Sequence, residues 1–473
     1  MPTKMTTAER EPKLPLNELT AISILDGRNR QDVAQLAPYV SEFNVIKTRI
    51  EVESKYLIAL SRTGVIHPLT KEEKNKLESF STNISLGQAR KIKKIESRTE
   101  HDVKAMEKSL RTMLEGTSLE DVIEKVHIGL TSEDINNITY RLILKRVTQD
   151  IFVPTLDAFV DELIKVAKVT KSIPMLARTH GQAAVPTTLG KEIIVFASRL
   201  NGEIRELETR QLSGKLTGAV GNLNALHEAY PNVDWIEFSK KFVSSFGLEP
   251  NLTTTQINPY EDIIAFIQNY QRINGIFLDF DQDMWRYISD DWFVQELKEG
   301  EVGSSTMPQK VNPIRFENSE GNLGKANALF EFMVRTLPVS RLQRHLSDST
   351  IIRDMGVPLG YSLLSYKNST AGFLRVRPNE AEIIDALNRD WAILSEAAQT
   401  IMRKSGVKDP YSLMAKLTRG KHIGKDEWIH LIEQLPLSDT EKQSLRNLTP
   451  ETYIGEAVKL TELAINKIIN SRK

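Results

Sequence analysis

The sequence has no cysteine, no excess of charge of either sign and no long apolar run. None of its 473 residues is cysteine, which excludes disulfides, thiolate nucleophiles and cysteine-ligated metal sites. Lys and Arg total 62, as do Asp and Glu, so nothing favours a polybasic surface for nucleic acid or membrane. No stretch approaches the ~20 consecutive apolar residues of a membrane span. We therefore expect a soluble, globular protein with no nucleic-acid or membrane partner.

The opening residues, MPTKMTTAEREPKLPLNEL, lack the apolar core of a secretory signal. The first dozen are polar, and we expect a mobile tail there. Together with the absence of cysteine, this favours a cytoplasmic localisation.

Apolar residues recur at intervals of three and four over long segments, which is the pattern of one buried helix face. The clearest segments are 154–170, 189–207 and 263–280. Alternating patterns typical of strands are scarce. Helices of this length bury an extended apolar stripe best against one another. The sequence therefore predicts an all-α protein with a long central helical bundle.

Breaks in the helical pattern suggest three domains. One break lies near residue 120 and another at RVRPNEAE, which spans 375–382. We expect an N-terminal helical domain over 1–120, a central helical bundle over 121–373 and a C-terminal helical domain over 374–473.

Two polar stretches precede expected helices. SRTEHDVKAME contains His101 and Asp102, and by spacing alone both are best interpreted as solvated helix residues. In HIGLTSEDINN, Thr131 and Asp134 have the spacing of a capping box, with Ser132 between them. The same helix start offers free N–H groups to an anion, so the capping and binding interpretations are compatible.

A third stretch, ARTHGQAAVPTTLGKE, places His180 in a loop rich in glycine and proline just before a long helix. A histidine there can act as a general acid or base near neutral pH, although most histidines do not. No HExxH or other metal-ligand spacing is present, so we expect no metal site.

A fourth stretch, GSSTMPQKVNPIRFENSEGN, begins at Gly303. Its small residues suit a mobile lid that closes over a ligand, and Lys310 and Asn312 are residue types that bind carboxylates. A surface loop leading into a helix explains the same composition. In RLQRHLSDSTIIRDMG, Arg344, Ser349 and Arg353 could bind a phosphate. Ion pairs of these arginines with Asp348 and Asp354 explain that spacing equally well.

Several of these motifs together resemble those of a known family. GSSTMPQKVNP is similar to the signature of the fumarase/aspartase superfamily. TSEDINN, RTHGQAA, GAVGNLNA and VSRLQRHLSDSTIIR resemble the adenylosuccinate lyases, in the bacterial branch that includes the enteric enzymes. TAISILDGR and YIGEAV fit the same branch, so the resemblance covers nearly the whole chain.

The resemblance implies an all-α, three-domain subunit whose central helices form a bundle shared within a homotetramer, with active sites built from several subunits. The implied reaction is β-elimination of fumarate in purine nucleotide biosynthesis. The substrates would be adenylosuccinate, giving AMP, and succinyl-AICAR ribotide, giving AICAR ribotide. No cofactor is implied.

The resemblance also assigns roles to residues. Ser304 would be the base and His180 the acid, with Glu317 hydrogen-bonded to the histidine. Position within the family signature, rather than chemistry, selects Ser304 over Ser305. The expected substrate-binding residues are Arg28, His101, Asp102, Thr131, Ser132, Thr179, Gln182, Gln256, Lys310, Asn312, Arg344, Ser349 and Arg353.

Two residues depart from the family pattern, which often has tyrosine at the position of Asn29 and histidine at that of Gln309. The alternatives are another fumarate-releasing lyase, such as argininosuccinate lyase or aspartase, and a catalytically inactive structural homologue. Arg344, Ser349 and Arg353 argue against other lyases, because the substrates of argininosuccinate lyase and aspartase carry no phosphate. The presence of His180, Ser304, Lys310 and Glu317 argues against an inactive scaffold.

Overall fold

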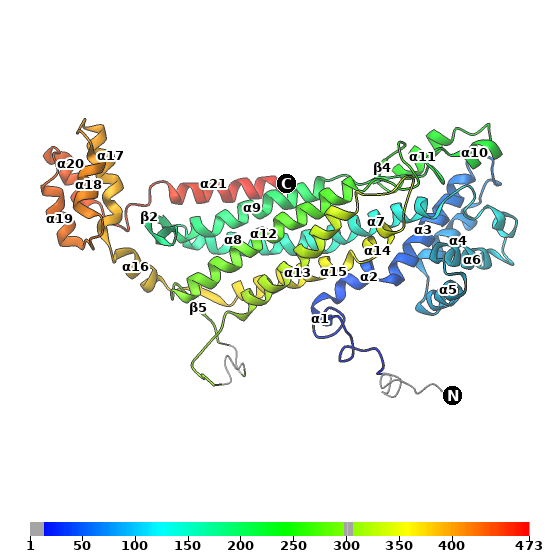
Figure 1. Ribbon diagram of the computed structural model, residues 1–473, viewed down its shortest axis with the longest axis horizontal. Helices are drawn as coiled ribbons and strands as arrows, with labels where there is room; N and C mark the ends of the chain where they lie inside the picture. The colour runs from blue at the N-terminus through cyan, green and yellow to red at the C-terminus, as the bar shows by residue number, and fades with distance from the viewer. Residues whose placement is uncertain (1–13, 298–299, 301–305, 473) are drawn as a thin grey trace, which may run out of the picture. The chain divides into compact units, whose positions relative to one another are not determined.

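The computed structural model describes residues 14–297, 300 and 306–472, and most of them are helical (Figure 1). The helices up to residue 152 are α1 (Arg30–Val33), η2 (Ala34–Leu36), α2 (Ala37–Val40), α3 (Glu42–Leu60), α4 (Lys71–Thr82), α5 (Leu86–Thr99), α6 (Asp102–Leu114), η3 (Glu120–Lys125), α7 (Ser132–Val147) and the π-helical turn η4 (Thr148–Phe152). The central helices are α8 (Val153–Thr170), α9 (Leu189–Thr209), α10 (Asn224–Ala229), α11 (Trp235–Ser244), α12 (Glu261–Ser289), α13 (Ile314–Thr336), α14 (Ser347–Arg353) and α15 (Gly356–Phe373). The last helices are α16 (Glu380–Asn388), η5 (Trp391–Leu394), α17 (Ser395–Lys404), α18 (Pro410–Thr418), α19 (Lys425–Glu433), α20 (Asp439–Asn447) and α21 (Ala457–Ser471).

The three long helices expected from apolar spacing are present as α8, α9 and α12. Their predicted stripes are buried: Leu156 and Leu163 of α8 and Ile193 and Leu200 of α9 are at most 1% exposed. The all-α class is therefore confirmed.

The chain divides into two compact units. The first unit comprises 1–154, 206–274 and 321–367, and the second comprises 155–205, 275–320 and 368–473. Helices α12, α13 and α15 contribute residues to both units. The three domains expected from the sequence stay a prediction.

In the first unit, helix α3 packs against α4, α6 and α7. Phe152 of η4 and Tyr270 of α12 make an edge-to-face ring contact at 5.0 Å, and Tyr270 stacks on Phe330 of α13. Helix α7, whose first residues line the pocket described below, is thus packed on the N-terminal helix α3.

In the second unit, a cluster of aromatic rings joins the long helices. Phe159 of α8 stacks on Phe277 of α12 at 4.8 Å, and Phe280 makes edge-to-face contacts with Phe196 of α9 and Phe373 of α15. The turn η5 and helices α17–α20 enclose a separate apolar core around Trp428.

Three small two-stranded sheets interrupt the helices, and the sequence did not predict them. The strands are β1 (Pro174–Thr179) with β2 (Gln182–Thr188), β3 (Ser213–Gly214) with β4 (Glu249–Pro250), and β5 (Phe293–Gln295) with β6 (Val376–Pro378). The β3–β4 pair is parallel and the other two are antiparallel. No helix in the described part of the chain is long and apolar enough to cross a membrane.

Candidate active site

A pocket of about 590 Å³ in the first unit is lined by residues from four separate stretches of the sequence. Eight of the expected substrate-binding residues are among its lining residues: His101, Asp102, Thr131, Ser132, Gln256, Arg344, Ser349 and Arg353. Glu100, Asn136, Leu346 and Thr350 complete the lining. The fold thus brings together residues that are up to 253 positions apart in the numbering of this chain.

His101 stands at the start of α6 as its N-cap. Its Nδ1 accepts a hydrogen bond from the Lys104 N–H at 3.2 Å. Since Nδ1 is the acceptor, the ring proton of the neutral histidine lies on Nε2. That nitrogen is 3.5 Å from the Ser132 hydroxyl, so the imidazole can donate toward Ser132 or toward a ligand in the pocket.

Asp102, next along α6, holds two arginines at once. One of its oxygens is 2.8 Å from Nη2 of Arg49 and 2.7 Å from Nη2 of Arg353. Burial opposes the charge on the carboxylate, but Arg49 and Arg353 outweigh it and lower the pKa of Asp102. Asp102 is thus ionised at neutral pH and anchors Arg353 beside the pocket.

The start of α7 has the capping box expected from the sequence. The Thr131 N–H donates to a carboxylate oxygen of Asp134 at 2.8 Å. The other oxygen of Asp134 accepts from the Thr217 N–H and lies 3.0 Å from the buried ammonium of Lys215. The box therefore also ties the pocket wall to the loop at 217–222.

Gln256 reaches the pocket from a neighbouring loop, where its side-chain amide donates to the Ala219 carbonyl at 3.1 Å. The two loops approach closely at Gly221, which has φ +82°. A Cβ at this position would lie 2.0 Å from the Thr254 carbonyl oxygen. Only glycine satisfies both the backbone conformation and this approach.

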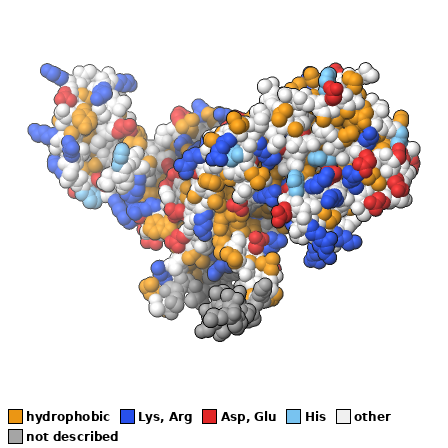
Figure 2. Space-filling view, turned by 45° about the vertical axis from the view of Figure 1, so that its right-hand side comes forward, with side chains coloured by type: hydrophobic (Ala, Val, Ile, Leu, Met, Phe, Trp, Pro, Cys, Tyr) orange, Lys and Arg blue, Asp and Glu red, His pale blue; other side chains and the backbone are white. Residues whose placement is uncertain are grey.

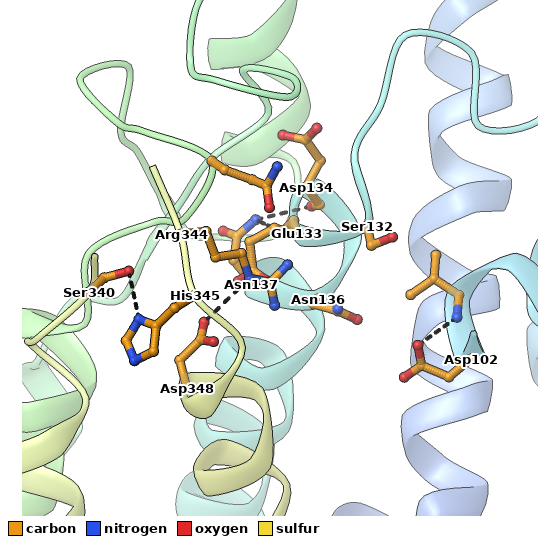
Figure 3. Close-up of polar contacts among 12 residues, drawn as sticks. Asp102, Ser132, Glu133, Asp134, Asn136, Asn137, Ser340, Arg344, His345 and Asp348 are labelled. Atoms are coloured by element: carbon orange, nitrogen blue, oxygen red, sulfur yellow. Dashed lines mark hydrogen bonds and ion pairs between the residues drawn. The ribbon is translucent and has the colours of Figure 1, made fainter. Parts of the chain in front are cut away.

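Arg344 precedes helix α14 rather than continuing it, so Arg344 and Arg353 are not on one helix. Figure 3 shows the Arg344 side chain pointing toward Glu133 of α7 and Asp348 of α14. Its Nη2 is 3.3 Å from Glu133, and its Nε is 3.8 Å from Asp348. The Tyr260 hydroxyl donates to Asp348 at 3.0 Å.

His180 lies in the second unit, at the tip of the β1–β2 hairpin. Thr179 and Gln182 pair across the turn, so His180 and Gly181 form a two-residue loop. Both have positive φ, 53° and 74°, as a type I′ hairpin turn requires. A histidine in this conformation is uncommon, and such strain gathers at functional sites. His180, Thr179 and Gln182 are all exposed.

Lys310, Asn312 and Glu317 also belong to the second unit. Lys310 and Asn312 lie just before α13, and Glu317 is in its first turn. A carboxylate oxygen of Glu317 accepts a hydrogen bond from the Trp285 indole at 3.1 Å. Among the described residues of one chain, Glu317 makes no hydrogen bond to His180, and that expected pairing stays a prediction.

Two families match the sequence. The family described as "Lyase" matches residues 31–327, and the one described as "Adenylosuccinate lyase C-terminal" matches 340–454. The adenylosuccinate lyase of Haemophilus influenzae is 42% identical over 453 residues, covering 95% of this chain and 99% of the relative. The chain belongs to the adenylosuccinate lyase family.

Other members of the adenylosuccinate lyase family are similarly close. The Escherichia coli K12 enzyme is 40% identical over 95% of this chain and 99% of its own length. The Dictyostelium discoideum enzyme is 44% identical over 93% of this chain and 98% of its own length. The resemblance inferred from short motifs is therefore confirmed.

Solved structures share the family fold at much lower identity. A 3-carboxy-cis,cis-muconate lactonizing enzyme from Pseudomonas putida is 17% identical, with a TM-score of 0.71 over 93% of this chain and 98% of its own. A fumarate lyase from Mesorhizobium sp. BNC1 is 15% identical, with a TM-score of 0.73 over 92% and 97%. They confirm the fumarase/aspartase type of fold.

Besides the expected residues described above in the second unit, two further expected residues are not found in the pocket. Arg28 is exposed and is not among the lining residues. Ser304, the expected base, lies outside the described residues. Within the part of the chain that the structure describes, no group of three or more His, Asp or Glu side chains could hold a metal ion.

Sequence reasoning missed Arg49, Glu133 and Tyr260, which hold the pocket residues in place. Arg49 carried a usable signal, because it lies between the buried Ile46 and Ile50 on α3, where an unpaired charge would be costly. Glu133 lies within the capping motif, where an acidic residue is expected at a helix start, so nothing marked it as a partner of Arg344. Tyr260 gave no signal, because its partner Asp348 is 88 positions away.

Proposed function

We propose that the chain cleaves adenylosuccinate to AMP and fumarate, and succinyl-AICAR ribotide to AICAR ribotide and fumarate. The observation that carries this proposal is the pocket that gathers Arg344, Ser349 and Arg353, because two arginines and a hydroxyl suit a nucleotide phosphate. Membership of the adenylosuccinate lyase family supports the same substrates.

The reaction is a β-elimination. A base removes a proton from the carbon next to a carboxylate, the bond from the adjacent carbon to nitrogen breaks, and fumarate's double bond forms. An acid protonates the departing nitrogen. In this proposal Ser304 is the base and His180 the acid, while Lys310 and Asn312 bind a carboxylate of the substrate. The positive charge of Lys310 also stabilises the carbanion that develops.

The hairpin supports the role of His180. The two-residue turn is short, so it holds the backbone of His180 in a defined conformation at the tip of the hairpin. The side chain is exposed there and is accessible to a substrate. General acid catalysis needs such a positioned group. Glu317, in the first turn of α13, would orient the histidine when the two meet in the assembled enzyme.

We also propose that the chain acts as a homotetramer in the cytoplasm, with active sites shared between subunits. The central helices expose large apolar side chains, namely Val195 of α9, Trp285 of α12 and Phe332 of α13, which are 38%, 43% and 50% exposed. Hydrophobic side chains also appear in groups among the charged ones on the face drawn in Figure 2. Exposed apolar patches of this kind are typical of subunit interfaces.

A substrate panel tests the proposed activity. Purified protein is incubated with adenylosuccinate, succinyl-AICAR ribotide, argininosuccinate or aspartate, and fumarate release is measured. We expect turnover of the first two alone. Turnover of argininosuccinate or aspartate without adenylosuccinate would assign the chain to another lyase, and no turnover at all would support the inactive homologue.

A further inference from the structure

Arg344 is enclosed by acidic groups. Its side chain is 14% exposed, whereas that of Arg353 is 44% exposed. Glu133 and Asp348, the two carboxylates beside it, are 4% and 3% exposed at their side chains. The guanidinium lies between them (Figure 3), and its Nε has no hydrogen-bond partner among the described residues. Arg344 thus lines the pocket while buried carboxylates hold its guanidinium by charge.

The charges in this cluster do not balance locally. Two buried carboxylates share the single cation of Arg344, and Tyr260 adds a neutral hydroxyl on Asp348. The other cations facing Glu133 are Arg141 and Lys215, which already pair with Asp262 and Asp134. Burial raises the pKa of Glu133 to about 7; Arg344 opposes this shift and Asp348 adds to it. Glu133 can therefore change protonation near neutral pH.

We propose that Glu133 and Asp348 are positioning residues for Arg344, and that phosphate binding at Arg344 draws a proton onto this carboxylate pair. The inference rests on the proposed function, because Arg344 is taken as a ligand of the nucleotide phosphate. It goes further by giving a role to two carboxylates that do not themselves line the pocket.

The physical reason is the cost of unpaired buried charge. A phosphate dianion that engages the guanidinium of Arg344 competes with both carboxylates for one cation. Leaving a buried carboxylate ionised beside the phosphate is unfavourable, whereas a proton on Glu133 removes the repulsion and turns the carboxyl into a hydrogen-bond donor. The bound state thus holds more protons than the free state. By linkage, affinity for the phosphate falls as pH rises through the free-state pKa of Glu133.

Calorimetric titration of the enzyme with AMP tests this coupling. Titrations at pH 7.5 in two phosphate-free buffers with different ionisation enthalpies give the number of protons taken up. We expect a substantial fraction of one proton per AMP for the wild type and close to none for Glu133→Gln. Between pH 7 and pH 8, where the phosphate itself is largely dianionic, wild-type affinity should fall about threefold and that of Glu133→Gln should hardly change.

Glu192→Gln is the matched control. Glu192 of α9 is a partly buried carboxyl whose pKa is also raised by burial, but its hydrogen-bond partner is Tyr287 rather than an arginine. We expect Glu192→Gln to take up protons as the wild type does. Equal proton uptake by the wild type and Glu133→Gln would overturn the coupling.

Kinetics with adenylosuccinate test the positioning role. Glu133→Ala removes the contact with Arg344, so KM should rise by at least tenfold while kcat changes less than threefold, and Glu133→Gln should restore most of the affinity. A fall in kcat with an unchanged KM would contradict positioning of the phosphate ligand.

Titration with inorganic phosphate needs no turnover. If adenylosuccinate is not cleaved, that titration still tests the coupling while the proposed function fails.

Discussion

At the scale of single residues, the two candidate phosphate arginines are already paired with carboxylates. Arg353 contacts Asp102, and Arg344 contacts Glu133 and Asp348. The sequence left open whether these arginines bind phosphate or form ion pairs, with Asp348 and Asp354 as the expected partners. The structure shows ion pairs, but mainly with acids far away in the sequence. Such pairs hold the guanidinium groups at a pocket wall, so pairing and ligand binding are compatible.

Replacing His180 tests the acid. We expect His180→Ala to lower kcat by about 10²- to 10⁴-fold, the usual contribution of a general acid, without loss of folding. Steady-state kinetics on adenylosuccinate measure the effect, and circular dichroism checks the fold. His422→Ala, at an exposed histidine among the C-terminal helices, serves as the control and should keep its activity. Near wild-type turnover by His180→Ala would remove His180 from the mechanism.

Replacing Arg353 tests the phosphate pocket. Arg353→Ala should raise KM by about 10- to 100-fold, because a hydrogen bond to a charged group contributes about 1.5–3 kcal/mol. Asp102 keeps Arg49 as its partner in this variant, so the pocket wall should persist and kcat should change little. Arg62→Ala, at an exposed arginine outside this pocket, is the matched control. A loss confined to kcat would contradict the assignment.

Residue types and their order predicted much of the site, and eight of the expected substrate-binding residues line one pocket. The residues that hold the pocket together were not predicted. Arg49, Glu133 and Tyr260 act through partners 53 to 211 positions away, and local spacing carries no information on such pairs.

At the scale of elements, helices were predicted well and short strands were not. The apolar period extends over α8, α9 and α12, and such long repeats are hard to mistake. Strands β1 (PMLART) and β2 (QAAVPTT) show no clean alternation of apolar and polar residues. Each also contains a proline, which disfavours a strand assignment. The signal that was overlooked is the His180-Gly181 pair, whose glycine suits a two-residue hairpin turn.

Helix α12 contains a buried acid whose removal should stabilise the bundle. Burial raises the pKa of Asp281 to about 8, although the Ser319 and Ser369 hydroxyls lower it in part. The folded state therefore binds a proton that the unfolded state releases near pH 4, so stability falls as pH rises from about 4 to 8. The advantage of Asp281→Asn over the wild type in free energy of unfolding should grow between pH 6 and pH 8, by up to about 1.4 kcal/mol per pH unit.

Thermal unfolding of both proteins across that pH range measures the difference. Asp385→Asn is the control, because Asp385 is an exposed acid on α16 that pairs with Arg389. The difference in free energy of unfolding between Asp385→Asn and the wild type should stay constant over this pH range. A pH-independent difference for Asp281→Asn would show that Asp281 is not protonated in the folded protein.

At the scale of the whole molecule, the expected catalytic and binding residues fall into both compact units. His180, Lys310 and Glu317 belong to one, and the phosphate arginines belong to the other. Sequence motifs predict membership of a site but not which copy of the chain supplies each residue. The proposed homotetramer therefore follows mainly from membership of the adenylosuccinate lyase family.

Light scattering coupled to size exclusion tests that assembly. The chain has a mass of 53.6 kDa, and we expect a particle of four times that mass. Mixing His180→Ala with Ser304→Ala, each inactive alone, should restore part of the activity if subunits share sites. A monomer with full activity would contradict both the tetramer and the shared sites.

The central claim is the cleavage of adenylosuccinate, and quantifying both products tests it most directly. Wild-type protein is incubated with adenylosuccinate alone, and AMP and fumarate are separated and measured over time. We predict that the two products appear in equal amounts as adenylosuccinate disappears. Persistence of adenylosuccinate, with neither AMP nor fumarate formed by folded protein, would contradict the account.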